Sequence, residues 1–498
     1  MNTKINLSIF QFSNFLIFPI FSTLLIFISL SSCKKDTVNT SSSAKLEFYR
    51  GAVQTDTIIL DTVFTTIGSI TEWLTVKNPS DQKIIVSKIY LAGGNNSNFR
   101  INIDGDPVNS KQDVEIAAND SLFIFIEVTV DPNGKNTPMI ITDSIVFETN
   151  GNVQDVQLVA WGQDAYFYAP APGEFFYPLD VSLTSLPTDK PNVFYGYAYV
   201  QAGSTLTIPA GAQLYFHAYS GIAADSAATI LVQGTKDNPV TFQGDRLEEY
   251  YEDVAGQWGY PLFGGIYLYP GSVNNQIDYA IIKNGYIGVE ADTLGNSSNP
   301  TLTINNTIIK NMANIGLLAQ GTKLKATNCV VANCAKYAVV CNIGGDYDFL
   351  HCTVGNYWGE STRSTPSVVI NNYYEDVNKN IQIRDLTNAY FGNCIIYGNL
   401  EGELVLDENK KGAFNYTFDH CLIKADTSIH TSLSNFVSVI TNKDPKFKDV
   451  SKYDLTLESN SPAINVGDIS IANTVPTDIL GIDRIINGSP DLGAYEAQ

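Results

Sequence analysis

Short apolar segments of one pattern recur through the second half of the chain. Each segment has a small residue followed by two aliphatic residues, except that the fourth has Thr353 before Val354, and in the first four an Asn stands four positions after the small residue. The small residues are Ala280, Thr307, Cys329, Cys352, Cys394 and Cys421, spaced by 27, 22, 23, 42 and 27 residues. A period near 22 residues with occasional longer intervals is typical of a solenoid with loops inserted at its turns.

The recurring columns predict how this solenoid is filled. The small residues and the β-branched residues two positions later point the same way from a strand, so stacked coils turn both columns into ladders inside a narrow core. The β-branched column is Ile282, Ile309, Val331, Val354, Ile396 and Ile423. A third column comprises Asn284, Asn311, Asn333 and Asn356. Because Asn tolerates the left-handed conformation, we expect these residues at a bend, with their amides bonded to neighbouring coils.

The first half of the chain has a different period. Between about residues 44 and 165 apolar residues alternate with polar ones, as in Leu122, Ile124, Ile126, Val128 and Val130, and turn clusters such as Asn78-Pro79-Ser80 separate the runs. Alternation of this kind predicts about seven short strands with one buried face, which suggests a β-sandwich. Residues 166–194 are then expected to connect the sandwich to the solenoid.

Features of the sandwich region resemble the Ig-like modules related to the ASH and choice-of-anchor D groups. They include Asn78-Pro79 at a strand end, Asp131-Pro132 and the terminal Ala160-Trp161-Gly162. Members of these groups mostly act as spacers or interaction modules. The resemblance therefore implies that this domain is not catalytic.

The solenoid region resembles right-handed parallel β-helix repeat proteins of the pectate-lyase-like kind. The segment Gly203 to Ala212 resembles their opening coils. Ser461 to Gly467 and Pro490 to Glu496 look like the closing segment of those labelled choice-of-anchor Q. The sequence therefore predicts an all-β protein, with an Ig-like β-sandwich over residues 44–165 and a right-handed parallel β-helix over residues 195–498. We assign the closing segment the role of a cap on the last coil.

Residues 1–32 have the features of a secretory signal. Lys4 precedes an apolar run from Phe15 to Leu30, which is shorter than a membrane-spanning helix and contains Pro19. The segment Leu30 to Cys33 resembles the lipobox of bacterial lipoproteins, which implies that Cys33 is lipidated and becomes the first mature residue. Residues 33–43 are polar and are expected to be a flexible tether. The expected location is the outer membrane of a Gram-negative bacterium, lipid-anchored, at the cell surface or facing the periplasm.

Composition narrows the classes of partner. The chain of 498 residues has a formal net charge of −21 and 16% charged residues. An acidic chain lacks the basic surface that nucleic acid requires, so we expect no nucleic-acid partner. The expected partners are the membrane, through the lipid anchor, and a polysaccharide or a surface protein.

Six cysteines remain after Cys33, and an oxidising compartment makes disulfides a possibility for them. Cys329, Cys352, Cys394 and Cys421 belong to the inward small-residue column, where we favour buried thiols over bridges. Cys334 and Cys341 have no assignment from the sequence. His351 and His420 precede two of the cysteines and are expected to point outward, but no Cys/His spacing resembles a metal site, so none is predicted.

Two segments carry the densest candidate chemistry. The first holds Asp245, Arg246, Glu248, Glu249, Tyr250, Tyr251, Glu252 and Asp253, with Trp258 nearby. Its rings could stack on sugars and its paired carboxylates could hold Ca²⁺, the one cofactor considered; a solvated loop is the alternative interpretation. The second is an insertion over residues 355–380 that contains Trp358 and could line a groove or be decoration.

Three functions are compatible with these patterns. The first is a noncatalytic surface module that binds a glycan or a protein partner along the β-helix. The second is a polysaccharide lyase or glycoside hydrolase acting on acidic polysaccharide, for which Asp245, Arg246 and Glu249 are the residues considered. The third is a structural or adhesive stalk, which fold alone does not separate from the first.

Overall fold

The computed structural model describes residues 37–132, 139–292, 299–486 and 488–497, which form two compact units that are described separately. The predicted signal segment and Cys33 lie outside these residues. Within the described residues, no helix is both long enough and apolar enough to cross a membrane.

Ten strands form the N-terminal β-sandwich. One sheet has the order β2-β1-β4-β8-β6 and the other β3-β10-β9-β5-β7. The strands are β1 (Glu47–Arg50), β2 (Val53–Gln54), β3 (Thr57–Phe64), β4 (Glu72–Lys77), β5 (Ile84–Leu91), β6 (Phe99–Ile103), β7 (Ser110–Ile116), β8 (Ser121–Val128), β9 (Met139–Thr149) and β10 (Asn152–Gln163), with a short 3-10 turn η1 (Gly94–Asn96).

The alternating pattern accounts for the sandwich core. On β8 the residues Leu122, Ile124, Ile126 and Val128 are buried, whereas Phe123 and Phe125 between them are exposed. The polar turn after β4 is fixed by Asn78, whose buried amide donates to the carbonyls of Gln82, Ile116 and Ala117. The predicted alternation is therefore confirmed in the strand where it is clearest.

The second unit is a parallel β-helix built from three sheets, and the predicted all-β fold is thus confirmed. Sheet 1 has eleven strands, and sheets 2 and 3 have nine each. Sheet 1 comprises β11 (Tyr166–Tyr168), β13 (Asn192–Phe194), β16 (Gln213–Phe216), β19 (Val240–Gly244), β22 (Ala280–Lys283), β25 (Ile308–Met312), β28 (Val330–Cys334), β31 (Thr353–Asn356), β36 (Ile395–Gly398), β39 (Leu422–Ile423) and β41 (Ile440–Thr441).

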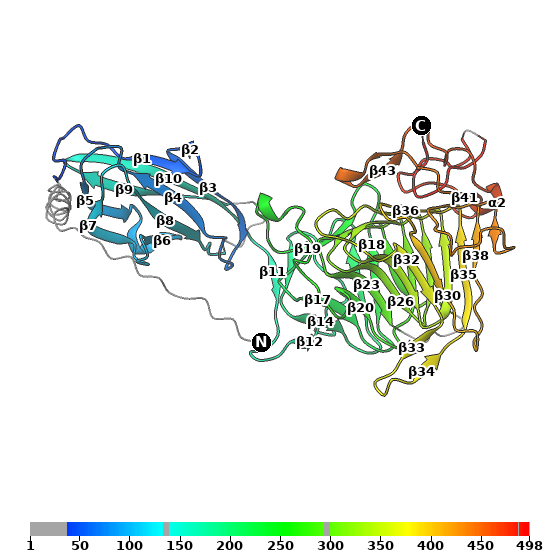
Figure 1. Cartoon of the computed structure of the whole chain (residues 1–498). Coiled ribbons are helices and arrows are strands. Elements are labelled where there is room, and N and C mark those ends of the chain that lie inside the picture. Colours follow the sequence, from blue (N-terminus) through cyan, green and yellow to red (C-terminus); the bar gives the residue numbers. More distant parts are fainter. Residues whose placement is uncertain (1–36, 133–138, 293–298, 487, 498) are drawn as a thin grey trace, which may run out of the picture. The chain divides into compact units, whose positions relative to one another are not determined.

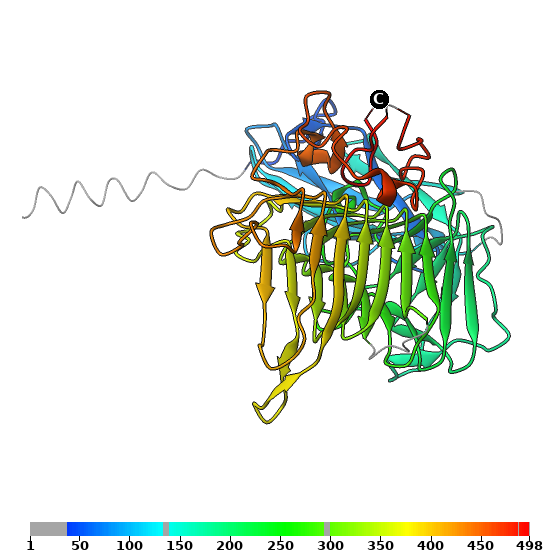
Figure 2. The same cartoon turned by 90° about the vertical axis from the view of Figure 1, so that its right-hand side faces the viewer.

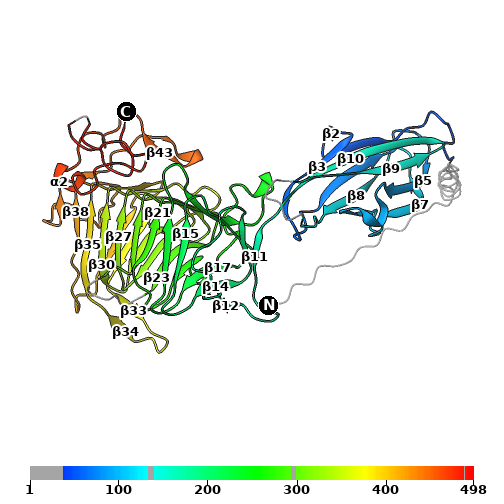
Figure 3. The ribbon, with the colours of Figure 1, turned by 180° about the vertical axis from the view of Figure 1, so that it is seen from behind.

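The chain passes from sheet 1 to sheet 2 and then to sheet 3 in each full coil (Figure 1). Sheet 2 comprises β12 (Phe176–Pro178), β14 (Tyr197–Val200), β17 (Gly221–Ala224), β20 (Ile266–Leu268), β23 (Ile287–Asp292), β26 (Ile315–Gln320), β29 (Tyr337–Asn342), β32 (Val368–Asn371) and β37 (Leu404–Asp407). Sheet 3, labelled along most of its length in Figure 3, comprises β15 (Thr205–Pro209), β18 (Thr229–Gln233), β21 (Asn275–Asp278), β24 (Leu302–Asn305), β27 (Lys323–Thr327), β30 (Gly345–Leu350), β35 (Leu386–Gly392), β38 (Thr417–Asp419) and β40 (Phe436–Val437).

The predicted columns of the solenoid are confirmed. Ile282 pairs in parallel register with Ile309, and the same column continues through Val331, Val354, Ile396 and Ile423. All six belong to one buried cluster together with the cysteines of the small-residue column. The parallel stacking is visible as a row of arrows in Figure 2. Like side chains thus meet along the axis of the coil.

The predicted Asn ladder is present at the turn from sheet 1 to sheet 2. Asn284, Asn311 and Asn333 have φ values of 66°, 59° and 50°, in the left-handed region. The amide of Asn311 donates to the side-chain oxygen of Asn284 at 2.8 Å, and that of Asn333 donates to Asn311 at 3.0 Å. Asn356 accepts from the backbone N–H of Cys334 instead. Asn is favoured here because it tolerates this φ and bonds across coils.

A second left-handed column lies at the turn from sheet 3 to sheet 1. Its members include Asn328, His351, Asn393 and His420, with φ between 50° and 53°. His351 lies on the outward side of the coil, as expected, but its ring is fully buried against Asp491 and Gly493 of the C-terminal segment, and its Nε2 lies 3.0 Å from the amide of Asn393. Burial lowers the pKa of His351, which favours the neutral ring. This histidine is therefore part of a turn ladder.

All six cysteines of the described residues are free and buried. Cys329, Cys352, Cys394 and Cys421 fill the inward column, and the backbone N–H of Cys352 contacts the Sγ of Cys394 at 3.3 Å. Burial raises the pKa of the Cys334 thiol to about 12. These thiols act as compact apolar filling.

The solenoid starts earlier than the sequence predicts. Residues 166–194, expected to connect the two domains, contain β11, β12 and β13, and β11 and β12 are the first strands of sheets 1 and 2. Tyr166 pairs with Asn192, and Phe176 pairs with Tyr197. A strand of three residues is too short to show a recognisable alternation of apolar and polar residues. The sequence of this segment therefore resembles that of a linker.

The C-terminal segment lies along the side of the solenoid instead of over its last coil, where the sequence places it as a cap. Beyond the hairpin β33 (Tyr373–Glu375) and β34 (Ile381–Ile383), the remaining elements are β42 (Phe447–Asp449), η3 (Val450–Lys452), β43 (Asp454–Leu457) and the short helix α2 (Ile469–Ala472). Leu455, Ala463 and Leu492 pack on the outward residues Val330, Ala332, Ile395 and Leu422 of sheet 1. The orange and red segment beside β36 and β41 in Figure 1 is this layer.

Candidate functional site

The acidic segment predicted as a site lies in the turn between β19 and β20, and three of its charged side chains are paired. Asp245 is buried and its carboxylate lies 2.8 Å from Nδ1 of His217, which raises the pKa of that histidine. Arg246 makes a two-point ion pair with the buried Glu248 and lies over the ring of Tyr251. Paired groups of this kind hold a loop together.

The rest of the segment is tied to the Asn ladder. Glu249 and Tyr251 belong to the 3-10 turn η2 (Glu249–Tyr251), and the carbonyls of Glu252 and Asp253 accept from the amides of Asn284 and Asn311. Tyr250 is 76% exposed. The segment lines a cavity of about 350 Å³. No group of three His, Cys, Asp or Glu side chains able to hold a metal occurs among the described residues.

The two tryptophans predicted to stack on a ligand are buried. Trp258 has no exposed surface, stacks on Phe216 with ring centroids 4.5 Å apart, and donates from Nε1 to the carbonyl of Lys283. Trp358 is 6% exposed and donates to the hydroxyl of Ser361. Neither ring has a face open to a sugar, because each fills the protein interior.

The cavity lined by the acidic segment includes no residue of the insertion over residues 355–380. Tyr453 of the C-terminal segment lies near both of them, and its pKa is raised by burial and by the charges of Asp253 and Glu360. Within the insertion, Arg363 is buried and makes a two-point ion pair with the buried Glu403. The described contacts thus make these loops parts of the packed structure.

Another pair of carboxylates stands out on the outer face of sheet 2. Glu290 and Asp292 lie two residues apart on β23, so both side chains point to the same face. The amide of Gln320, from the next coil, donates to Glu290 Oε1 at 3.0 Å and to Asp292 Oδ1 at 2.7 Å. Because both oxygens contact one nitrogen, the two carboxyl groups lie within two hydrogen-bond lengths of each other.

The remaining oxygens of the pair have their own donors. The backbone N–H of Gly264 donates to Glu290 Oε2 at 2.6 Å, and the hydroxyl of Tyr267 donates to Asp292 Oδ2 at 3.0 Å. Gln320 is itself oriented by Asn342, whose amide donates to the Gln320 carbonyl oxygen at 3.2 Å. The pair is thus positioned by groups from neighbouring coils of the same sheet.

Burial perturbs the titration of both carboxyl groups. Burial and the nearby charge of Asp292 raise the pKa of Glu290 to about 7, although its two hydrogen bonds lower it in part. Burial also raises the pKa of Asp292, against the hydrogen bonds from Tyr267 and Gln320. Perturbed carboxyl groups of this kind are typical of acid–base sites. Glu290 therefore gains or loses its proton near neutral pH.

Aromatic rings surround the pair on the side of the earlier coils. We call this set the aromatic platform: Phe175, Phe176, Tyr219, Tyr260, Phe263, Tyr267 and Tyr269. Tyr260 and Phe263 stack with centroids 4.7 Å apart, and Tyr267 and Tyr269 lie 4.3 Å apart. Phe175, Phe176 and Tyr219 are 38%, 42% and 50% exposed, and the other four are half-buried. A fixed set of partly exposed rings is costly to leave on a surface without a partner.

One peptide group joins the platform to the carboxylates. Tyr197 lies buried against Phe175, Phe176 and Phe263, and its hydroxyl donates to the carbonyl of Gly264. The N–H of the same Gly264 donates to Glu290. A side chain at this glycine would meet Glu290 at 2.7 Å, so the close approach requires glycine.

Sequence reasoning misses Glu290 and Asp292. Their roles depend on Gly264 and Gln320, which are 26 and 28 residues away from Glu290 and Asp292 in sequence. One signal is nevertheless present in the sequence, because carboxylates two residues apart share one face of a strand.

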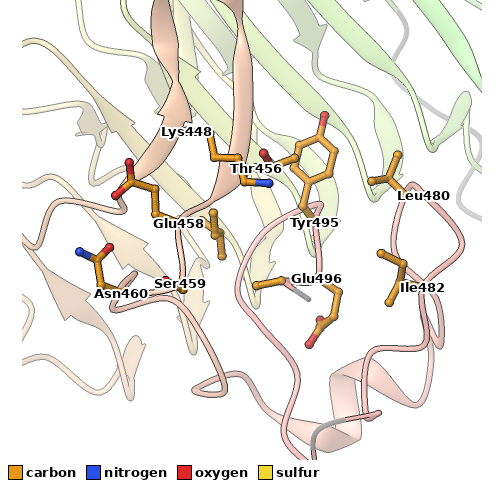
Figure 4. Close-up of a pocket in the computed structure, with 11 residues that line it drawn as sticks. Lys448, Thr456, Glu458, Ser459, Asn460, Leu480, Ile482, Tyr495 and Glu496 are labelled. Carbon is orange, nitrogen blue, oxygen red and sulfur yellow. The ribbon is translucent and has the colours of Figure 1, made fainter.

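A larger cavity lies within the C-terminal segment. It measures about 620 Å³ and is lined by polar and apolar side chains including Lys448, Thr456, Leu480 and Tyr495 (Figure 4). The buried Glu496 at its wall accepts from the N–H of Asp491 and pairs with the buried Arg484 at 3.5 Å. Burial raises the pKa of Glu496 to about 8. These contacts hold parts of the C-terminal segment together. Among the described residues, the cavity is not accompanied by a set of stacked rings.

Comparisons with known proteins yield no family assignment. Neither the scan against protein-family models nor the search of curated proteins returns a match. Among solved structures, the catalytic unit of a thermostable GH87 alpha-1,3-glucanase from Streptomyces thermodiastaticus is 8% identical, covers 71% of this chain and 72% of its own, and has a TM-score of 0.24. A family 123 glycoside hydrolase from Clostridium perfringens is 10% identical over 23% of this chain and 26% of its own, with a TM-score of 0.16. Likenesses this loose carry no argument, and the β-helix rests on its own strand register.

Proposed function

We propose that this protein is a lipid-anchored cell-surface protein that binds a glycan on the outer face of sheet 2. The observation that carries the proposal is the aromatic platform beside the Glu290–Asp292 pair. Rings stack on the apolar faces of pyranoses, and carboxylates and amides accept and donate hydrogen bonds to their hydroxyl groups. The anchor at Cys33 and the sandwich spacer are the parts of the proposal that rest on the sequence.

A glycan fits this face better than a protein partner. The aromatic platform lies beside a row of polar groups that bond in several directions, namely Gln320, Asn342 and the two carboxylates. A hydrophobic protein interface is instead depleted of charge at its centre. The proposal therefore takes the noncatalytic glycan-binding function considered from the sequence and moves it from the acidic segment to sheet 2.

Binding is tested by titration calorimetry of the full mature protein against laminarin, mannan, galactan, xylan and amylose. For the polysaccharide that binds, we expect the double variant Tyr260→Ala/Phe263→Ala to weaken binding about tenfold or more, because each lost ring contact contributes on the order of 1 kcal/mol. Tyr250→Ala is the matched control, since Tyr250 is exposed but lies in the acidic segment. Equal weakening by the control, or an unaffected double variant, would contradict the site.

The carboxylate pair supports a second candidate function, hydrolysis of the bound glycan. In glycoside hydrolases one carboxyl group protonates the leaving oxygen and a second acts on the anomeric carbon, and a short separation of about 5 Å accompanies retention of configuration. Glu290, with its pKa raised to about 7, would be the acid, and Asp292 the nucleophile. The shared contact to Gln320 gives the short separation.

Hydrolysis is tested by reducing-end release from the bound polysaccharide. We expect Asp292→Asn and Glu290→Gln each to lower the rate at least a hundredfold while binding stays within about threefold. Asp407→Asn, an exposed carboxylate on β37 of the same sheet, is the control and should leave the rate unchanged. Binding without any turnover by the unmodified protein would leave the noncatalytic function standing and remove the hydrolase.

A further inference from the structure

Sheet 2 differs from its two neighbours in the charges it carries. Its nine strands hold no Lys or Arg, and their charged residues are Glu290, Asp292 and Asp407. Sheet 1 carries Lys283 and Lys310, and sheet 3 carries Lys323 and Lys325. The proposed binding face is thus built on a sheet with carboxylates and no cation.

The turns around the aromatic platform likewise carry more carboxylates than unpaired basic side chains. The turns that follow β14, β17 and β20, residues 201–204, 225–228 and 269–274, add Asp225 and no Lys or Arg. In the turns that precede β17 and β20, His217 is paired with Asp245 and Arg246 with Glu248. The basic side chains of these turns, His217 and Arg246, are therefore each paired with a carboxylate of this chain.

The negative charge reaches the rings themselves. The pKa of Tyr269 is raised by burial and by the charges of Asp225 and Glu290. The pKa of Tyr267 is likewise raised by burial and by the charges of Asp292 and Glu290. A ligand stacked on these two rings would meet that field at short range, where it is screened little by salt.

We propose that sheet 2 selects a neutral glycan, composed of uncharged sugar units, and excludes uronate and sulfated glycans. This inference rests on the proposed glycan-binding function and names the class of ligand for the same face. A carboxylate or sulfate on the ligand would lie near Asp225, Glu290 and Asp292 without a basic side chain from sheet 2 to pair with it. The acidic polysaccharide considered from the sequence is thus the class that the face disfavours.

The test compares one polysaccharide in two forms. The neutral polysaccharide that binds, from laminarin, mannan, galactan and amylose, is oxidised at C6 so that its backbone stays the same and its units become uronates. We expect the oxidised form to bind the full mature protein at least about tenfold more weakly at low salt, with a smaller difference near 1 M salt, where the Debye length falls to about 3 Å.

Variants separate this inference from the proposed function. Asp225→Asn should narrow the difference between the two forms, because it removes one carboxylate beside the platform. Asp348→Asn, on β30 of sheet 3, makes the same change in net charge and should leave the difference intact. Equal or tighter binding of the oxidised form would overturn the inference that the ligand is a neutral glycan, and would leave the proposed glycan binding standing. Absence of binding to any polysaccharide overturns both the proposed function and this inference.

Discussion

Replacing Glu290 by glutamine removes a carboxyl group whose burial makes it titrate near neutral pH. The side chain is 3% exposed, and its pKa is raised from 4.5 to about 7 by burial and by Asp292. Between these two values the folded protein binds the proton more tightly than the unfolded chain does. Stability contributed by this group is therefore present at low pH and lost as the pH rises through 7.

The size of the effect follows from the two pKa values. Linkage between 4.5 and about 7 predicts that wild-type protein loses about 2.5 kcal/mol of stability from this group between pH 5 and pH 8. Glutamine does not titrate, so the variant escapes this loss. Glutamine also turns an amide toward one of the donors Gly264 and Gln320, which costs about 1–3 kcal/mol at every pH. The prediction therefore concerns how the difference in unfolding free energy between variant and wild type changes with pH, and not its value at one pH.

Urea unfolding at pH 5, 6, 7 and 8 measures that slope. The free energy of unfolding of Glu290→Gln minus that of wild type should rise by about 2.5 kcal/mol across the series. Glu496 titrates in both proteins and cancels from the difference, so the slope reports Glu290 together with its coupling to Asp292. Infrared spectra at pH 6 should show a stronger protonated-carboxyl band in wild type than in the variant, because Glu496 contributes to this band in both proteins. A difference in stability that stays constant from pH 5 to pH 8 would contradict a raised pKa at Glu290.

Three further changes test other parts of the fold. Arg363→Met leaves the buried Glu403 without its cation and should lower stability by about 3–5 kcal/mol in urea, with part regained in the double variant Arg363→Met/Glu403→Met. Asn311→Ala, at φ 59°, should lower the melting midpoint more than Asn311→Gly, because glycine keeps the left-handed backbone and loses only the amide contacts. The six buried cysteines should resist alkylation by iodoacetamide until urea unfolds the protein, and labelling at the native rate of an exposed thiol would contradict their burial.

The repeating columns of sheet 1 could be predicted because each residue's role is local and recurs. Ile282, Ile309 and Val331 stand two residues after a small side chain, and the same constraint acts in every coil. The Asn ladder could be predicted for the same reason, since its left-handed bend recurs at one position of the repeat.

The site on sheet 2 depends on contacts that one repeat does not contain. Glu290 acquires its character from burial under the turn at Gly264 and from the amide of Gln320 in the next coil. Trp258 misled the sequence analysis in the opposite direction, because a tryptophan beside acidic residues and tyrosines suggests an exposed ligand contact, whereas this ring stacks on Phe216 inside the core. Composition alone does not distinguish a ring that fills the core from one on the surface.

The layer formed by the last residues has a consequence for how the solenoid comes apart. Its contacts reach from Asn328, which donates to the carbonyl of Thr477, to Asn393, which holds Asp468 and Gly493. Coils of a repeat array normally interact only with their neighbours and can fray one at a time. Here one C-terminal segment contacts several coils at once. The middle coils therefore become fully stable only after the end of the chain has folded onto them, and their unfolding is coupled. Cleavage near Asp444 would therefore loosen the centre of the stack as well as its end.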